Sequence, residues 1–311
     1  MAFGIQTVKR AFSRFFESRS AIAPCAKLRQ DVINQFDECD PTSLHLETRR
    51  PIQGSTKRSD NMSLRIGVPL EYNTFELDPL VRRTWAYTLS SLQDRGHKIV
   101  PVSLPLTRSA LSAYYILAPS EASSNLAKYD GIRYGKLSNP EDTSKRHVLY
   151  SKARGSGFSA EVKRRILLGS YSLSAGAIDN YFIQAQKVRR MVRSEFDSVF
   201  RFANPLLDTK ETGPMTAESP QVDVLVTPTA PTLPPSISAL SKRTPIDSFN
   251  DDVLTVPASL AGLPAVSVPV SLHDEQLGLG NPSVPFAGIQ IIGQLGDDEL
   301  VLRVAAQLEG L

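Results

Sequence analysis

Histidine and cysteine are the side chains that most often hold metal ions, and this chain has few of them. The chain contains His45, His97, His147, His273, Cys25 and Cys39. No histidine has a second histidine, cysteine or carboxylate at metal-ligand spacing, and two cysteines are too few for a four-thiolate site or a disulfide scaffold. The sequence therefore predicts no metal site. His97 follows an expected helix and is typical of a residue near a helix C-terminus.

One glycine-rich stretch comes nearest to a phosphate-binding loop. It runs Arg154-Gly155-Ser156-Gly157. The stretch follows no expected strand and lacks the Lys-Ser/Thr pair of a P-loop, so an ordinary flexible connection is favoured.

The composition of the 311 residues, with 41% hydrophobic and 22% charged side chains, is typical of a globular protein of one large or two small domains. The longest apolar runs, such as 113–119, are far shorter than the ~20 residues of a membrane span, so no membrane insertion is expected. Residues 1–30 hold six basic side chains and a single acidic one, and the rest of the chain is slightly negative. That balance excludes a broad positive surface for tight nucleic-acid binding.

Residues 1–39 form a segment distinct from the rest. Ile5, Val8, Phe12 and Phe15 recur at helical spacing among basic residues, which is typical of a mitochondrial transit peptide. A surface helix with basic residues is the alternative. We expect residues 40–311 to hold the folded domain, with residues 36–63 forming a loop.

The elements that would position a site alternate between strands and helices. A strand is predicted at 64–69, a helix from Asp78-Pro79 to Gly96, and a strand at 98–104, which together make a βαβ unit. Helices are predicted at 107–126 and from Ser159 onward. The second pattern is interrupted at Gly169 and Gly176, which indicates either two helices or one kinked helix. Strands at 222–227, 265–270 and 288–293 and a closing helix at 297–308 complete an α/β fold: a mixed, largely parallel sheet flanked by helices.

Four stretches form an ordered series that resembles the C-terminal half of the amidase-signature family. They are LRIGVPLEY at 64–72, AYYILAPSEASSNLAKYDGIRYG at 113–135, VKRRILLGSYSLSAG at 162–176 and DVLTVPASLAGLP at 252–264. The resemblance runs from about residue 40 to residue 311. Within the family, the series is most similar to the glutaminase (A) subunits of glutamyl-tRNA(Gln) amidotransferases. The polar insertion at 203–221 resembles the mitochondrial, fungal branch.

The resemblance implies amide hydrolysis by a serine nucleophile, a bridging cis-serine and a lysine, with backbone amides holding the oxyanion. In the family these residues precede the LRIGVP-like strand. Here only 63 residues precede that strand, and they contain no Gly-Gly-Ser-Ser-Gly-Gly loop. We therefore assign no catalytic residue in this chain.

The resemblance does carry three substrate-binding residues over to this sequence. Arg165 matches the residue that pairs with the glutamine α-carboxylate, Asp252 the acid that receives the ammonium, and Tyr114 an aromatic that lines the pocket. Residue type alone favours a solvated helix residue for Arg165 and a cap of the following helix for Asp252, and only the family motifs favour the binding roles.

The implied role is that of a glutaminase component, which supplies ammonia from glutamine for converting Glu-tRNA(Gln) to Gln-tRNA(Gln) in the mitochondrial matrix. The partner implied is the B subunit of the amidotransferase, which would use ATP and Mg, and this chain would need no cofactor. Two-subunit and three-subunit complexes both stay open. The alternatives are another amidase-signature hydrolase and a catalytically inactive fragment or remnant.

Overall fold

The computed structural model describes residues 63–130, 133–134, 155–206, 221–240, 249–272 and 286–309. The N-terminal segment 1–39, almost all of the loop expected at 36–63 and most of the insertion at 203–221 lie outside the described residues.

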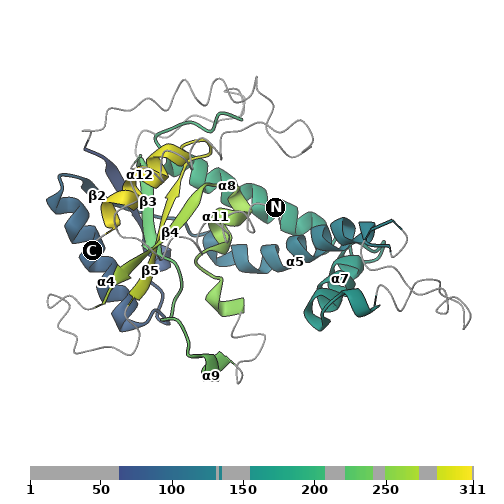
Figure 1. Ribbon diagram of the computed structural model, residues 1–311. Helices are drawn as coiled ribbons and strands as arrows, with labels where there is room; N and C mark the ends of the chain where they lie inside the picture. The colour runs from purple at the N-terminus through teal and green to yellow at the C-terminus, as the bar shows by residue number, and fades with distance from the viewer. Residues whose placement is uncertain are drawn as a thin grey trace, which may run out of the picture.

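A single sheet forms the centre of the described structure (Figure 1). Its strands are β1 (Arg65–Pro69), β2 (Lys98–Val102), β3 (Val224–Pro228), β4 (Ala265–Ser271) and β5 (Phe286–Gly293). They lie side by side in the order β2-β1-β3-β5-β4. Every predicted strand is present, with ends that shift by a few residues.

The sheet is mixed, as the sequence predicts. β1 pairs in parallel with both β2 and β3, whereas β5 is antiparallel to both β3 and β4. Among the described strands, β5 alone runs in the reverse direction, and it joins the two sides of the sheet. Leu225 lies opposite Ile292 in this central pairing, and both are fully buried.

Helices α4 (Pro79–Asp94) and α12 (Asp298–Leu308) cover one face of the sheet. The carboxylate of Asp78 accepts a hydrogen bond from the Leu80 N–H at 2.7 Å, which satisfies one of the free amides at the start of α4. The apolar stripe of α4 faces the strands, and its Trp85 Nε1 donates to the Val226 carbonyl at 3.0 Å. Gly96, at φ 90°, ends the helix in the left-handed conformation that glycine adopts most easily.

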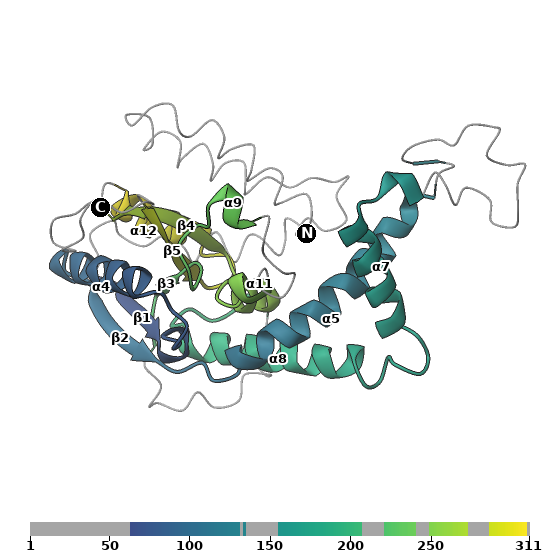
Figure 2. The ribbon, with the colours of Figure 1, turned by 90° about the horizontal axis from the view of Figure 1, so that it is seen from below.

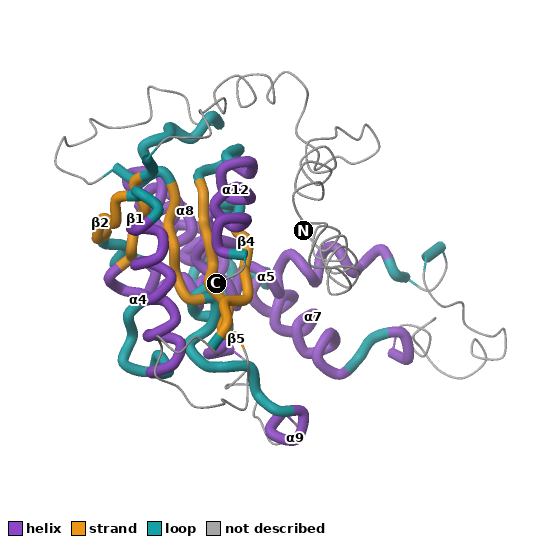
Figure 3. The backbone as a smooth tube through the Cα atoms, turned by 60° about the vertical axis from the view of Figure 1, so that its left-hand side comes forward, coloured by secondary structure: helices purple, strands orange, loops and turns teal. Residues whose placement is uncertain are grey.

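Helices α5 (Thr107–Asn125), α8 (Phe182–Val199) and α11 (Val256–Ala261) cover the opposite face. Figure 3 shows the strands between these two helical layers. Short helical segments are η2 (Leu70–Tyr72), η3 (Leu126–Lys128) and α9 (Ile237–Leu240). Of the two alternatives for the segment that begins at Ser159, two helices are found, because α7 (Ala160–Ser172) and α8 are separate. The interruption includes Gly176, whereas Gly169 lies inside α7.

Helices α5 and α7 form an arm that extends away from the sheet (Figures 1 and 2). α5 begins against the sheet layer and continues through Pro119, and α7 packs on its outer part. Proline removes one helical hydrogen bond without ending this helix. The outer part of α5 therefore holds α7, while the first part of the same helix packs in the core.

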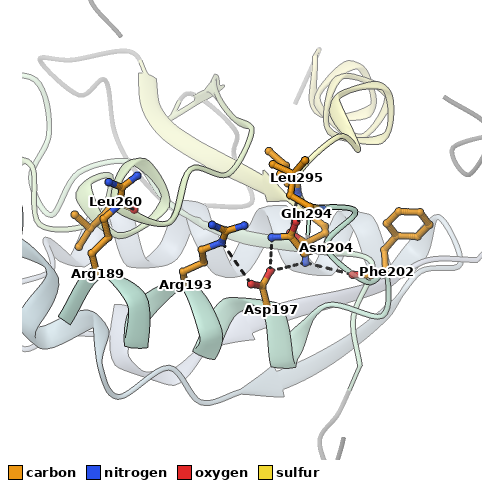
Figure 4. A network of polar contacts seen from close by, with 9 residues as sticks. Arg189, Arg193, Asp197, Phe202, Asn204, Leu260, Gln294 and Leu295 are labelled. Carbon is orange, nitrogen blue, oxygen red and sulfur yellow. Dashed lines mark hydrogen bonds and ion pairs between the residues drawn. The ribbon is translucent and has the colours of Figure 1, made fainter. Parts of the chain in front are cut away.

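A buried polar network fastens α8 to the end of β5 (Figure 4). Asp197 Oδ1 accepts hydrogen bonds from Asn204 Nδ2 and Gln294 Nε2, each at 3.0 Å. Arg193 Nε lies 3.7 Å from the other carboxylate oxygen. Because buried polar groups need partners, this set fixes how α8 crosses the sheet.

His97 joins two elements rather than capping a helix with its ring. Its Nδ1 accepts from the Leu64 N–H at 3.2 Å, and its Nε2 lies 2.8 Å from Gln307 Oε1. The ring therefore links the start of β1 to α12.

Within the described ranges, no helix is long and apolar enough to cross a membrane.

Candidate functional site

The three residues carried over from the family lie on three segments that meet beside α5. Tyr114 is on α5, Arg165 is on α7, and Asp252 is in the turn before α11. α5 packs against both α7 and α11. In addition, Arg189 Nε on α8 donates to the Leu260 carbonyl of α11 at 3.1 Å, which ties α11 to the helical layer (Figure 4).

A close crossing of two backbones places Arg165. Gly169 of α7 lies directly on the carbonyl group of Pro119 in α5, where a Cβ atom would come 2.5 Å from the Pro119 carbonyl carbon. One turn earlier on α7 is Arg165. α7 itself begins at Ser159, whose hydroxyl accepts from the Val162 N–H at 3.4 Å.

Asp252 is held by a tyrosine that sequence reasoning did not select. The hydroxyl of Tyr115 donates to Asp252 Oδ2 at 2.8 Å. Asp252 does not cap α11 with its side chain, since the N-cap of α11 is Thr255; its backbone carbonyl instead accepts from the N–H groups of Thr255 and Val256. The side chain of Asp252 is therefore bound to α5 and does not cap α11.

Two aromatic neighbours hold the Tyr115 ring. Phe249 lies with its ring centroid 4.3 Å from that of Tyr115, and Tyr114 meets it edge-on at 5.4 Å. Tyr114 is half-buried and also packs against the apolar cluster beneath α5. Tyr114 therefore contacts Tyr115, and Tyr115 binds Asp252.

Charged neighbours act on the Tyr115 hydroxyl in opposite directions. Burial, followed by the hydrogen bond to Asp252 and the charge of that carboxylate, raises the pKa of Tyr115, while the positive charge of Arg165 lowers it. The Tyr115 hydroxyl is therefore bound to the negative Asp252 and is also influenced by the positive charge of Arg165.

Arg165 is paired on its own helix. Its Nε donates to Glu161 Oε1 at 3.0 Å, and Arg164 binds the other oxygen of the same carboxylate. The side chains of Arg165 and Glu161 are 45% and 43% exposed, so the pair is weak in water. A ligand carboxylate can approach the remaining donors of the Arg165 fork.

A negative and a positive side chain on neighbouring segments suit a ligand that carries an ammonium and a carboxylate, as free amino acids do. Tyr115, Phe249 and Glu161 are the parts of this arrangement that the sequence analysis missed. The AYY motif alone cannot tell which tyrosine reaches across, because adjacent helical residues point about 100° apart. Within the described part of the chain, no group of three or more His, Cys, Asp or Glu side chains could hold a metal ion.

Two carboxylates fix the start of α5. Glu71 accepts from the Ser103 hydroxyl and the Leu104 N–H, each at 2.7 Å, and Glu195 of α8 accepts from the Leu106 N–H at 3.0 Å. Partial burial and the nearby Glu71 charge raise the pKa of Glu195 from 4.5 to about 7, although the Leu106 N–H favours the ionised form.

The raised pKa of Glu195 predicts a pH-dependent stability. The favourable contribution of this group is complete below pH 4.5 and is lost as the pH rises through about 7, because the folded state holds the proton more tightly than the unfolded state. We expect Glu195→Gln to raise the free energy of unfolding at pH 8 relative to the unsubstituted chain, with little change at pH 5. The glutamine carbonyl can still accept from Leu106.

Urea denaturation at pH 5, 6, 7 and 8 measures this effect. Ser194→Ala, on the exposed side of the same turn of α8, serves as the control and should keep the pH dependence of the original chain. A parallel pH profile for Glu195→Gln and Ser194→Ala would contradict the prediction.

Comparison with known proteins places the chain in a family. A sequence model of the amidase family matches residues 11–302. The chain belongs to the amidase family. The match begins within residues 1–39, ahead of the described residues. The match confirms the resemblance to the amidase-signature family.

Curated family members with high similarity come from fungi. The chain is 55% identical over 289 residues to the A subunit of mitochondrial glutamyl-tRNA(Gln) amidotransferase of Coccidioides posadasii, covering 89% of this chain and 56% of that protein. The corresponding protein of Emericella nidulans is 53% identical, with 90% and 57% covered. The chain thus spans little more than half the length of these relatives.

Solved structures agree with the fold. The A subunit of glutamyl-tRNA(Gln) amidotransferase from Thermotoga maritima matches with a TM-score of 0.52 and 28% identity, covering 79% of this chain and 42% of that one. The urea amidolyase of K. lactis matches with a TM-score of 0.59 at 17% identity, covering 91% of this chain and 14% of that one. At that identity, the second match supports the fold alone.

Proposed function

We propose that this chain is the glutamine-recognising part of the A subunit of a mitochondrial glutamyl-tRNA(Gln) amidotransferase. The observation that carries the proposal is the hydrogen bond between Asp252 and Tyr115 of α5, the helix against which α7 with Arg165 also packs. The similarity to fungal proteins of that name supports the choice of glutamine as the ligand.

In this function the chain binds the head group of glutamine and leaves the carboxamide for the catalytic residues. Arg165 receives the α-carboxylate, Asp252 receives the α-ammonium, and Tyr114 lines the pocket. Two fixed charges orient the amino acid, so its amide carbon is held at a constant distance from them. In this proposal the attacking serine, the cis-serine and the lysine come from the other half of an amidase domain.

The wider role follows from the same proposal. Ammonia released from glutamine passes to the B subunit, the partner that uses ATP and Mg to amidate Glu-tRNA(Gln), in a complex of two or three subunits in the mitochondrial matrix. The slightly negative balance of residues 31–311 is consistent with the tRNA being bound chiefly by the partner.

A chimera tests the proposal. The N-terminal half of the Coccidioides posadasii protein, joined to residues 40–311 of this chain, is expected to release ammonia from glutamine. The 311-residue chain alone is expected to release none above the buffer rate, because it has no activated nucleophile. A folded chimera that hydrolyses other small amides but not glutamine would instead favour a general amidase, and glutamine hydrolysis by the chain alone would overturn the assignment of the nucleophile to the other half.

A further inference from the structure

Tyr115 connects the core helix α5 to the acidic residue of the site. Its hydroxyl donates to Asp252 Oδ2 at 2.8 Å, and its ring is held by Phe249 at 4.3 Å and by Tyr114 at 5.4 Å. A ring held by two aromatic neighbours has little freedom to turn, so the position of its hydroxyl is set by α5.

Asp252 needs such an anchor. It is exposed and lies in a turn before a short helix, where an aspartate side chain would otherwise sample several rotamers. With Oδ2 accepting from Tyr115, the carboxylate is fixed in one orientation, and Oδ1 offers its lone pairs to a ligand donor. Ordering the carboxylate before the ligand arrives removes that entropy loss from binding.

We propose that Tyr115 is a positioning residue, which fixes the Asp252 carboxylate so that the site selects ligands carrying an α-ammonium group. This inference rests on the proposed function and names a residue that the family resemblance did not supply. Tyr115 acts on recognition of the ammonium group alone. Its loss should therefore weaken binding of an amino acid and leave binding of the matching des-amino acid unchanged.

The residues of the head-group site all lie on this chain, so direct binding to the 311-residue chain is the test. Isothermal titration calorimetry compares L-glutamine with glutaramate, the same molecule without its α-amino group. We expect Tyr115→Phe to weaken glutamine binding about 3- to 10-fold, the range for one net hydrogen bond, and to leave glutaramate binding unchanged. The phenylalanine ring keeps its packing against Phe249.

A double-mutant cycle separates positioning from general damage. If Tyr115 acts through Asp252, Tyr115→Phe added to Asp252→Asn should weaken glutamine binding no further than Asp252→Asn alone. Tyr171→Phe, the same change at an exposed tyrosine of α7, should bind both ligands as the unsubstituted chain does.

Two results distinguish failure of this inference from failure of the proposed function. If the original chain prefers glutamine and Tyr115→Phe keeps that preference, or weakens both ligands equally, the positioning role is wrong and the proposed function stands. If the original chain binds both ligands equally or neither of them, recognition of the α-ammonium by Asp252 is wrong, and the proposed function fails with it.

Discussion

Arg165→Ala in the chimera is expected to raise the KM for glutamine about 10- to 150-fold while changing kcat little. The substitution removes a charge-assisted hydrogen bond to the α-carboxylate, worth roughly 1.5–3 kcal/mol, which converts to that range. Because the carboxylate lies at the far end of the ligand from the scissile amide, the loss falls on binding. Steady-state ammonia release at varied glutamine concentration measures both constants.

Arg164→Ala is the matched control for this change. Arg164 lies on the same helix, about 100° around from Arg165, and shares the carboxylate of Glu161 with it. Its KM should stay close to that of the parent chimera. If Arg164→Ala raises the KM and Arg165→Ala does not, the assignment of residues on this helix is wrong by one position. If neither substitution changes the KM, the proposed carboxylate site on this helix is wrong.

Gly169→Ala is expected to separate α7 from α5 and to destabilise the chain by about 1–3 kcal/mol, the usual range for overpacking. The added methyl group would overlap the carbonyl group of Pro119 and come 2.9 Å from the Ser120 backbone nitrogen. A backbone held inside a helix cannot move aside as a side chain can. Since α7 carries Arg165, glutamine binding by the chain should fall as well. Urea denaturation and calorimetry follow the two effects.

Gly176→Ala gives the comparison. A Cβ at Gly176 meets nothing within 4 Å, so the same chemical change should leave stability unchanged or raise it slightly by restricting the unfolded chain. Equal losses at Gly169 and Gly176 would mean that the helix crossing is not the cause.

Most of the fold follows from local patterns in the sequence. Asp78-Pro79 and Gly96 mark the ends of α4 because an N-cap, a proline at the first turn and a left-handed glycine each have a local physical cause. The pairing of β5 between β3 and β4 has no such signal, because strand order depends on contacts between distant residues. Gly169 is read from the sequence as a helix breaker, yet it lies inside α7, where it permits the approach to Pro119.

The candidate site, like the fold, is predicted by the sequence only in part. Family motifs point to Arg165 and Asp252, and the structure places Arg165 on a helix that packs against α5 and Asp252 in a hydrogen bond with Tyr115 of α5. To choose between Tyr114 and Tyr115, one must know how α5 is oriented about its own axis. That orientation is set by packing against α8 and α11. The mitochondrial segment at 1–39 stays a prediction, since it lies outside the described residues.

The reversed strand β5 also affects how the chain is completed during synthesis. Among the described strands, β3 and β4 do not pair with each other, and β5 (Phe286–Gly293), the strand that joins them, follows both in the chain. Until those residues leave the ribosome, the β1–β3 half of the sheet and the strand β4 remain unjoined, and each has an open edge. Stable closure of this sheet therefore waits until residues 286–293 have been translated, and a nascent chain halted before residue 286 would expose both edges to chaperones and to aggregation.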